Sequence, residues 1–261
     1  MTFSSAIRLR HVGKTYANGT VALDDVNLAI APTEFVSLVG PSGCGKSTVL
    51  RLMAGLSPLS NGTVEWGDAL SRDRLSFVFQ DASLMPWATV QDNVRLPLRL
   101  AGVPKAKAEA AIANALKMVD LQGYERAYPR QLSGGMKMRV SIARSLVTQP
   151  SLMLMDEPFG ALDEMTRSRL NSDILHLWET QRWTVVFVTH NIYEAVYLSQ
   201  RVVVMAAQPG RIVADIAIDA PYPRNDAFRT SPLFNNYCRD VAQQLAEASL
   251  GMPPLADLRQ P

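Results

Sequence analysis

The most constraining feature of this sequence is the segment Gly40-Pro-Ser-Gly-Cys-Gly-Lys-Ser47. An apolar run, Phe35 to Val39, precedes it and predicts a buried central strand, while apolar residues at helical spacing follow it from Ser47 to Leu56. A glycine, four residues and then Gly-Lys-Ser form the phosphate-loop pattern. A strand that leads through this loop into a helix predicts an α/β fold that binds a nucleoside triphosphate.

The chemistry of phosphate explains the spacing of this loop. Its glycines let successive backbone N–H groups turn toward phosphate oxygens, and the helix that follows directs its positive end at the same oxygens. Lys46 is suited to neutralise the β and γ phosphates, and the Ser47 hydroxyl is suited to ligate Mg²⁺. The alternative is a glycine-rich turn without a ligand. The residues predicted to bind the nucleotide here are Gly40, Pro41, Ser42, Gly43, Cys44, Gly45, Lys46, Ser47 and Thr48.

Cys44 either fills a tolerant position of the loop or carries a reactive thiol. Its place near a helix N-terminus and beside Lys46 predicts a lowered pKa, because both features stabilise a thiolate. On this interpretation, bound ATP should protect the thiol from alkylation.

Two acidic residues, Asp156 and Glu157, end the apolar run Leu152 to Met155. Ionised carboxylates at the end of a buried strand are costly unless they meet cations or take part in chemistry. We expect Asp156 to hold Mg²⁺ through its water shell. We expect Glu157 to polarise an attacking water, a role that contributes roughly 10²–10⁴-fold in rate. The alternative is a solvated strand end without a chemical role.

A second glycine-containing segment, Ser133 to Gly135, precedes another predicted helix, Met136 to Val147. Ser133 can cap that helix, and the glycines expose its first backbone N–H groups. By themselves these residues fit an ordinary helix start. In a chain that also has a phosphate loop, they form a candidate second anion site.

The order of predicted elements divides the chain into a core, an insert and a tail. Runs typical of strands lie on both sides of a stretch that is helical by propensity, in which Lys105 to Val119 is rich in Ala, Lys and Glu. We expect an α/β core at 5–81 and 151–218, a helical subdomain at 82–150 and a tail at 219–261. The other predicted elements are strands at 7–9, 26–30, 64–66, 75–79, 185–188, 202–205 and 212–218 and a helix at 166–178.

The tail contains an amphipathic pattern from Phe234 to Leu245, with apolar residues three and four positions apart. We expect this helix to pack on the core; contact with a partner is the alternative.

Composition narrows the class of protein. With 48% hydrophobic and 19% charged residues, the chain is predicted to be globular and soluble, and its net charge of +2 gives little reason to expect nucleic-acid binding. Met1 to Arg10 lacks the apolar segment of a signal peptide, and no stretch reaches the ~20 apolar residues that a membrane span needs. Cys44 and Cys238 offer neither a disulfide framework nor a metal spacing, which suits a reducing cytosol.

Taken together, these motifs closely resemble the ATP-binding subunit of ABC transporters over roughly residues 5–218. The resemblance rests on the phosphate loop, Gln80, Leu132 to Met136, Asp156-Glu157, Ala161 to Asp163 and His190, and the Leu-Ser-Gly-Gly signature is highly specific to the family. Asp156 to Asp163 is similar to the importer branch. Within the importer branch, the chain resembles the group that transports nitrate, sulfonates and taurine. The segments that carry this resemblance are Glu194 to Ser199, Arg201 to Met205 and Pro209 to Val213.

The resemblance implies a P-loop NTPase fold: a mixed sheet flanked by helices, with antiparallel strands at the N-terminal side and an inserted α-helical signature subdomain. It also implies that Tyr16 stacks on adenine, that Gln80 joins Mg²⁺ and water to the helical subdomain, and that His190 contacts the γ-phosphate. Asp163 would lie in the loop that crosses the dimer contact. Without the resemblance, His190 is more simply a capping or core histidine.

In this family, two subunits enclose two ATP molecules, each between one phosphate loop and the partner's signature. For this chain the resemblance implies ATP and Mg²⁺ as cofactors, a second copy as partner, and Ser133, Gly134 and Gly135 directed at the partner's nucleotide. Hydrolysis would drive a separate membrane permease, with an extracytoplasmic solute-binding protein involved indirectly. The subunit would lie at the cytoplasmic face of the inner membrane and power uptake of a small solute such as nitrate, a sulfonate or taurine.

The sequence departs from the usual family pattern in a few places. Lys137 and Met138 follow the signature where other residues are usual, Asn191 follows His190 where Asp is common, and Tyr193 stands where an acid is frequent. None of these changes removes a predicted phosphate or Mg²⁺ group, so we expect them to tune activity.

Asp81 to Trp87 matches the stretch of such importers against which a short permease helix docks. Met85 and Trp87 either form that adaptable surface or belong to the core of the helical insert. After Ile218 we expect no regulatory β-domain like that of the sugar-importer branch.

Two other functions compete with transport. A soluble ABC ATPase for DNA repair or translation usually carries a coiled-coil insert or two fused halves, and neither is visible here. A nucleotide-binding protein without hydrolysis is opposed by the presence of Glu157, Gln80 and His190.

Overall fold

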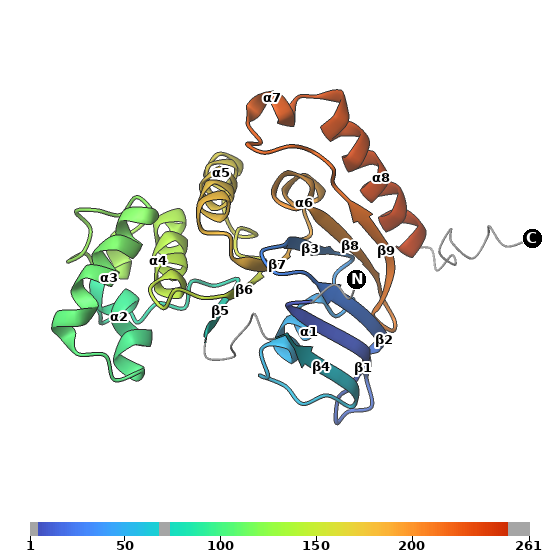
Figure 1. Ribbon diagram of the computed structural model, residues 1–261, viewed down its shortest axis with the longest axis horizontal. Coiled ribbons are helices and arrows are strands. Elements are labelled where there is room, and N and C mark those ends of the chain that lie inside the picture. Colours follow the sequence, from blue (N-terminus) through green and yellow to red (C-terminus); the bar gives the residue numbers. More distant parts are fainter. Residues whose placement is uncertain (1–4, 68–73, 250–261) are drawn as a thin grey trace, which may run out of the picture. The chain divides into compact units, whose positions relative to one another are not determined.

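A computed structural model describes residues 5–67 and 74–249 of the chain (Figure 1). Residues 68–73 of the predicted core and 250–261 of the predicted tail lie outside this description. The chain forms two compact units, one of Met1–Ser71 with Arg182–Pro261 and one of Arg72–Gln181. Within the described residues, no helix is both long enough and apolar enough to cross a membrane.

The first unit contains two sheets. Three antiparallel strands form one of them, in the order β2 (Val21–Ile30), β1 (Ile7–Thr15) and β4 (Asn61–Trp66). In the other sheet, β3 (Phe35–Val39) lies parallel to both β7 (Thr184–Val188) and β8 (Arg201–Ala206), and β9 (Arg211–Ala217) pairs antiparallel with β8. Every residue of β3 and β7 is buried, which explains their continuous apolar runs.

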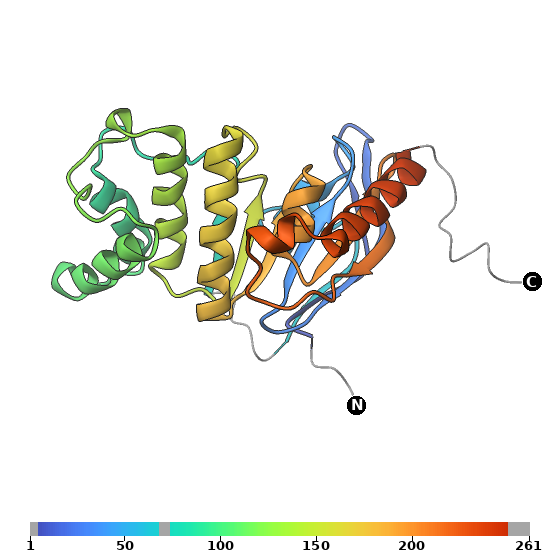
Figure 2. The same ribbon diagram turned by 90° about the horizontal axis from the view of Figure 1, so that it is seen from above.

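Helices cover the mixed sheet of the first unit. The helix after the phosphate loop, α1 (Lys46–Met53), contacts β7 and β2, whereas α6 (Ile192–Leu198) packs on β3 and β8. The tail helix α8 (Pro232–Ser249) packs on β8, β9 and α6, next to the short helix α7 (Asp226–Arg229). Figures 1 and 2 show α6 and α8 side by side. The tail helix therefore packs on the core, as expected from the sequence.

The second unit joins a strand pair to a group of helices. Its strands β5 (Leu75–Val78) and β6 (Leu152–Asp156) are parallel. Helix α4 (Gly134–Leu146) packs on β5, on α5 (Glu164–Gln181) and on two further helices, α2 (Val90–Leu100) and α3 (Lys105–Met118). A short 3₁₀ helix, η2 (Pro129–Gln131), precedes α4.

Each predicted strand overlaps a strand of the structure, but three helices were not predicted: α2, α6 and the four-residue α7, which lies in a segment expected to be a loop. Helix α2 contains Pro97, which cannot donate a backbone hydrogen bond, and a fully buried polar residue, Asn93, which interrupts the apolar pattern. Helix α6 is short, and its start depends on a cap from Asn191. Tertiary contacts and caps, more than periodicity, define these two elements.

A buried arginine fastens the start of the tail to α6. Arg224 is only 4% exposed and donates to the carbonyl oxygens of five residues at 2.8–3.3 Å, namely Val196, Tyr197, Ser199, Ile218 and Ala220. In return, the Tyr197 hydroxyl donates to the carbonyl oxygen of Arg224 at 2.9 Å. The Arg224 guanidinium group thus provides hydrogen-bond donors for carbonyl oxygens that have no partner within a helix or a sheet.

Replacing this arginine should destabilise the first unit. Arg224→Met leaves several buried carbonyl oxygens without their donor, so we expect the free energy of unfolding to fall by about 3 kcal/mol or more. Urea unfolding monitored by circular dichroism measures the change. Arg211→Met, at an exposed position at the start of β9, is the matched control. A loss below about 1 kcal/mol for Arg224→Met would contradict this account of Arg224.

Candidate functional site

The phosphate loop connects β3 to α1 and has the backbone that its glycines predict. Gly43 and Gly45 have φ angles of +78° and +95°, a region that other residues rarely adopt. A Cβ atom at Gly40 would lie 2.6 Å from the carbonyl oxygen of Met205, so only glycine lets the chain leave β3 beside β8. A Cβ atom at Gly43 would meet no atom within 4 Å, so the loop has open space at that point.

Lys46 begins α1 and folds back over the loop. Its side chain is buried, and its Nζ donates to the carbonyl oxygens of Gly40 at 2.9 Å and Pro41 at 3.1 Å. Both acceptors are backbone carbonyl oxygens of the loop, so these two bonds hold the ammonium group over the loop. A phosphate group in the loop would be bound by the ammonium group and by the first backbone N–H groups of α1, so the residues present fit a nucleotide.

Tyr16 lies beside the first turn of α1. Its hydroxyl and that of Thr48 are 3.2 Å apart, and the Lys14 ammonium lies 5.3 Å from the centre of the Tyr16 ring. The ring is still 38% exposed. The first unit therefore brings an accessible aromatic surface next to the phosphate loop, as stacking on a base would require.

The structure corrects the prediction for Cys44. The residue is fully buried, and burial raises the pKa of its thiol above the ordinary value. The Lys46 ammonium, 3.8 Å from Sγ, acts in the opposite direction but more weakly. The predicted lowered pKa was wrong, because the local sequence shows the neighbouring charge and does not show the desolvation.

His190 lies exposed between β7 and α6, and the residues on either side of it are fixed. Thr189 donates its hydroxyl hydrogen to the buried Glu194 carboxylate, and the backbone N–H of Asn191 donates to the Thr189 hydroxyl at 3.0 Å. The side-chain oxygen of Asn191 caps α6 by accepting from the backbone N–H groups of Tyr193 and Glu194. Asn191 thus performs the capping that an aspartate would perform, and the loop of His190 is anchored to α6.

In the second unit, Gln80 lies two residues after β5, and the acidic pair lies at the end of the neighbouring strand β6, with Asp156 as its last residue. Val78 of β5 is in register with Met155 of β6, so both strands end at the same edge. Asp156 is buried, and Glu157 has a φ angle of +46°, an uncommon conformation for a residue other than glycine. Backbone strain of this kind is often found at functional sites, and here it coincides with a buried acidic strand end, which is consistent with a chemical role for the acidic pair.

The signature segment starts α4 close to the loop that contains Asp163. Ser133 caps the helix, its Oγ accepting from the backbone N–H of Met136 at 3.3 Å. A Cβ atom at Gly135 would lie 2.5 Å from the side chain of Thr166, so glycine permits this close approach. Asp163 accepts from the backbone N–H of Thr166 at 3.0 Å, and this bond lowers the pKa of its carboxyl group. Ser133 and Gly134 remain exposed at the helix start.

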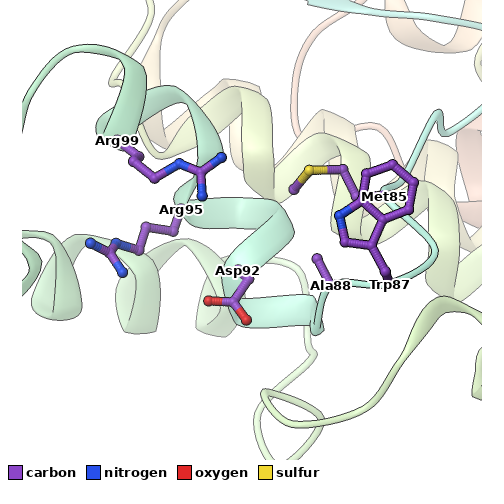
Figure 3. A pocket seen from close by; sticks show the side chains of 6 residues that line it. All are labelled: Met85, Trp87, Ala88, Asp92, Arg95 and Arg99. Atoms are coloured by element: carbon purple, nitrogen blue, oxygen red, sulfur yellow. The ribbon is translucent and has the colours of Figure 1, made fainter.

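A pocket of about 320 Å³ lies in the same unit and was only partly predicted. Figure 3 shows Met85 and Trp87 on one side of it and three side chains of α2 on the other; its lining residues are Met85, Trp87, Ala88, Asp92, Arg95 and Arg99. Trp87 is 77% exposed, so it is not a core residue. The spacing of residues 92, 95 and 99 places them on one helical face, a signal that was not used because α2 was not predicted.

Comparison with known proteins identifies the family. A family model described as ABC transporter matches residues 23–160. An uncharacterised ABC transporter ATP-binding protein of Methanocaldococcus jannaschii is 46% identical over 237 residues, covering 89% of this chain and 87% of that protein. The aliphatic sulfonates import ATP-binding protein SsuB of Bacillus cereus is 41% identical over 232 residues, covering 87% of this chain and 90% of that protein.

A solved structure of a dimeric ATP-binding cassette bound to ADP and phosphate has a TM-score of 0.71 and 33% identity, covering 82% of this chain and 100% of that chain. This likeness confirms the predicted P-loop NTPase fold with its mixed sheet flanked by helices. The family match, the sequence identities and the shared fold show that this chain belongs to the ABC transporter family and is an ATP-binding subunit that couples ATP hydrolysis to transport.

Proposed function

We propose that this chain is the ATPase of an importer for a small organic anion of the sulfonate type, with two copies closing around two Mg-ATP molecules. The proposal rests mainly on two helix N-termini in the same chain that can each bind an anion. Helix α1 begins directly after the phosphate loop, and helix α4 begins directly after Ser133. Two such anion sites that face one triphosphate from opposite copies form a closed, symmetric pair. The name of the Bacillus relative supports import and the sulfonate class.

Each residue of the site has a role in this proposal. The N–H groups of the loop and Lys46 bind the phosphates, and Tyr16 stacks on the adenine. Ser47 and Asp156 would hold Mg²⁺, which would neutralise charge on the phosphate oxygens, and Gln80 would lie close enough to contact the metal and the attacking water. Glu157 orients and polarises that water, and His190 contacts the γ-phosphate. The other copy contributes Ser133, Gly134 and Gly135, with Asp163 at the contact between the copies.

This arrangement turns ATP hydrolysis into movement. While the γ-phosphate is present, it attracts the helix starts of both copies, so its loss removes the main attraction between them. Closing and opening of the dimer would then be passed to a separate permease. We place the docking site for the permease at the pocket in Figure 3, where Met85 and Trp87 accept an apolar side chain and Arg95 and Arg99 accept a carboxylate. The chain would work at the cytoplasmic face of the membrane, with a solute-binding protein acting on the far side.

A soluble ABC ATPase is the second candidate, and the pocket argues against it. The pocket contains none of the residues assigned to the nucleotide, and exposed aromatic and arginine side chains such as Trp87, Arg95 and Arg99 are typical of protein interfaces.

Glu157→Gln should separate nucleotide binding from hydrolysis. The amide keeps the size of the side chain but cannot polarise water, so we expect ATP hydrolysis to fall by at least about 10²-fold. The ATP-bound dimer should then accumulate, which size-exclusion chromatography with light scattering in Mg-ATP detects. Glu109→Gln, on the exposed face of α3, is the control and should stay active. A Glu157→Gln chain that remains monomeric in saturating Mg-ATP would count against the sandwich.

Growth of the source organism tests the transported class and the pocket together. Deleting the gene should prevent growth on an aliphatic sulfonate as the sole sulfur source and leave growth on sulfate unchanged. A Trp87→Ala copy should restore growth poorly, because it lacks the apolar anchor for the permease, whereas Leu56→Ala, at another exposed apolar residue, should restore it fully. Normal growth of the deletion strain on every sulfonate would refute this solute class. Full rescue by Trp87→Ala would refute the docking site.

A further inference from the structure

The segment from Asp81 to Met85 connects Gln80 to the wall of the pocket, and side chains of two helices hold it. Arg144 belongs to α4, the helix that Ser133 starts, and Asn93 belongs to α2, the helix that forms the opposite wall of the pocket. Neither residue is part of the nucleotide site or lines the pocket. Their hydrogen bonds connect the predicted nucleotide site to the pocket.

Arg144 binds two consecutive carbonyl oxygens of this segment. Its Nη2 donates to the oxygen of Ala82 at 2.8 Å, and its Nη1 donates to the oxygen of Ser83 at 2.9 Å. Ser83 has a φ angle of +47°, so the backbone turns where the guanidinium holds it. Because the fork is planar and its two donors are fixed relative to each other, it holds both carbonyl groups in one orientation and ties them to α4.

Asn93 holds the next part of the segment. It is fully buried, its Oδ1 accepts from the backbone N–H of Met85 at 2.7 Å, and its Nδ2 donates to the carbonyl oxygens of Met85 and Ala88, both at 3.2 Å. Met85 and Ala88 line the pocket. The wall of the pocket is therefore tied to α2, two residues along the chain from the carbonyl that Arg144 holds.

We propose that Arg144 is a positioning residue that couples the pocket to Gln80 and to the start of α4. A side chain that enters the pocket displaces Met85, the displacement reaches Ser83 and Ala82 through the chain, and Arg144 passes it to α4. Coupling between two sites is reciprocal, so nucleotide bound at Gln80 and Ser133 changes the pocket. This inference rests on the proposed function, because it takes Gln80 and Ser133 as nucleotide contacts.

Trp87 at the rim of the pocket provides a direct readout. The full chain with Glu157→Gln, labelled with 5-fluorotryptophan, gives one ¹⁹F resonance for Trp87 that the further substitution Trp87→Phe identifies. Saturating Mg-ATP should shift this resonance. In Arg144→Leu the shift should decrease at least about twofold at equal ATP saturation. Arg144→Lys keeps the charge but not the paired donors, and it should give an intermediate response.

Arg139 supplies the matched control. It lies on the same helix, donates to the carbonyl oxygen of Val119 at 2.8 Å and pairs with Asp173, so it loses comparable bonds but does not contact residues 81–85. Arg139→Leu should therefore retain the Trp87 shift, which a role of Arg144 in stability alone would not predict. Should Arg144→Leu fail to fold, Arg144→Lys carries the test.

A Trp87 shift of equal size in the parent, Arg144→Leu and Arg144→Lys chains would overturn the proposal. The proposal would also be overturned if the Trp87 resonance did not shift in a parent chain that binds ATP and dimerises. In that case the proposed function would still stand. A parent chain that binds no ATP would contradict both the proposed function and the role of Arg144.

Discussion

A triphosphate carries several negative charges, and a protein can take them out of water only where donors and positive charges replace the lost hydration. In this chain the first turn of α1, the glycine backbone of the loop and the Lys46 ammonium would supply that environment. The loop is fixed from outside as well, since Gly40 lies against the carbonyl oxygen of Met205 and Gly45 lies against Leu23. The mixed sheet of the first unit therefore fixes the backbone of the loop that we propose to bind phosphate.

The elements that we propose to respond to the nucleotide are held by polar side chains, most of them buried. The loop of His190 is anchored through Thr189 and Glu194, and α6 is in turn tied to the tail by Arg224. In the second unit, Arg144 and Asn93 perform the same function for the segment after Gln80. Arg144 and Asn93 satisfy backbone atoms outside regular secondary structure, and Arg224 satisfies carbonyl oxygens at the end of α6, so these connections have a defined shape without forming a sheet or a helix.

Much of this organisation could be predicted from the sequence. Strands β3 and β6 are buried on both faces, so their apolar runs are unmistakable, and the loop motif depends on local backbone geometry that glycine spacing specifies. Helix α2 was not predicted because Pro97 and Asn93 interrupt its apolar periodicity. For the same reason, the arginines of α2 that line the pocket were not predicted to lie there. The pKa of Cys44 was predicted in the wrong direction because desolvation comes from residues distant in the sequence. Arg224 was missed for the same reason, since its acceptors lie at 196–199 and 218–220.

We propose that a working site needs the loop of one copy and the signature of the other. It can be tested by mixing two inactive chains, one with Lys46→Ala and one with Ser133→Arg, and measuring ATP hydrolysis. Either variant alone damages both sites of its own dimer, whereas a mixed dimer contains one site in which the loop and the signature are both intact. If the two sites act independently, the mixture should recover roughly a quarter of wild-type activity. A mixture no more active than the two variants measured separately would contradict the composite site.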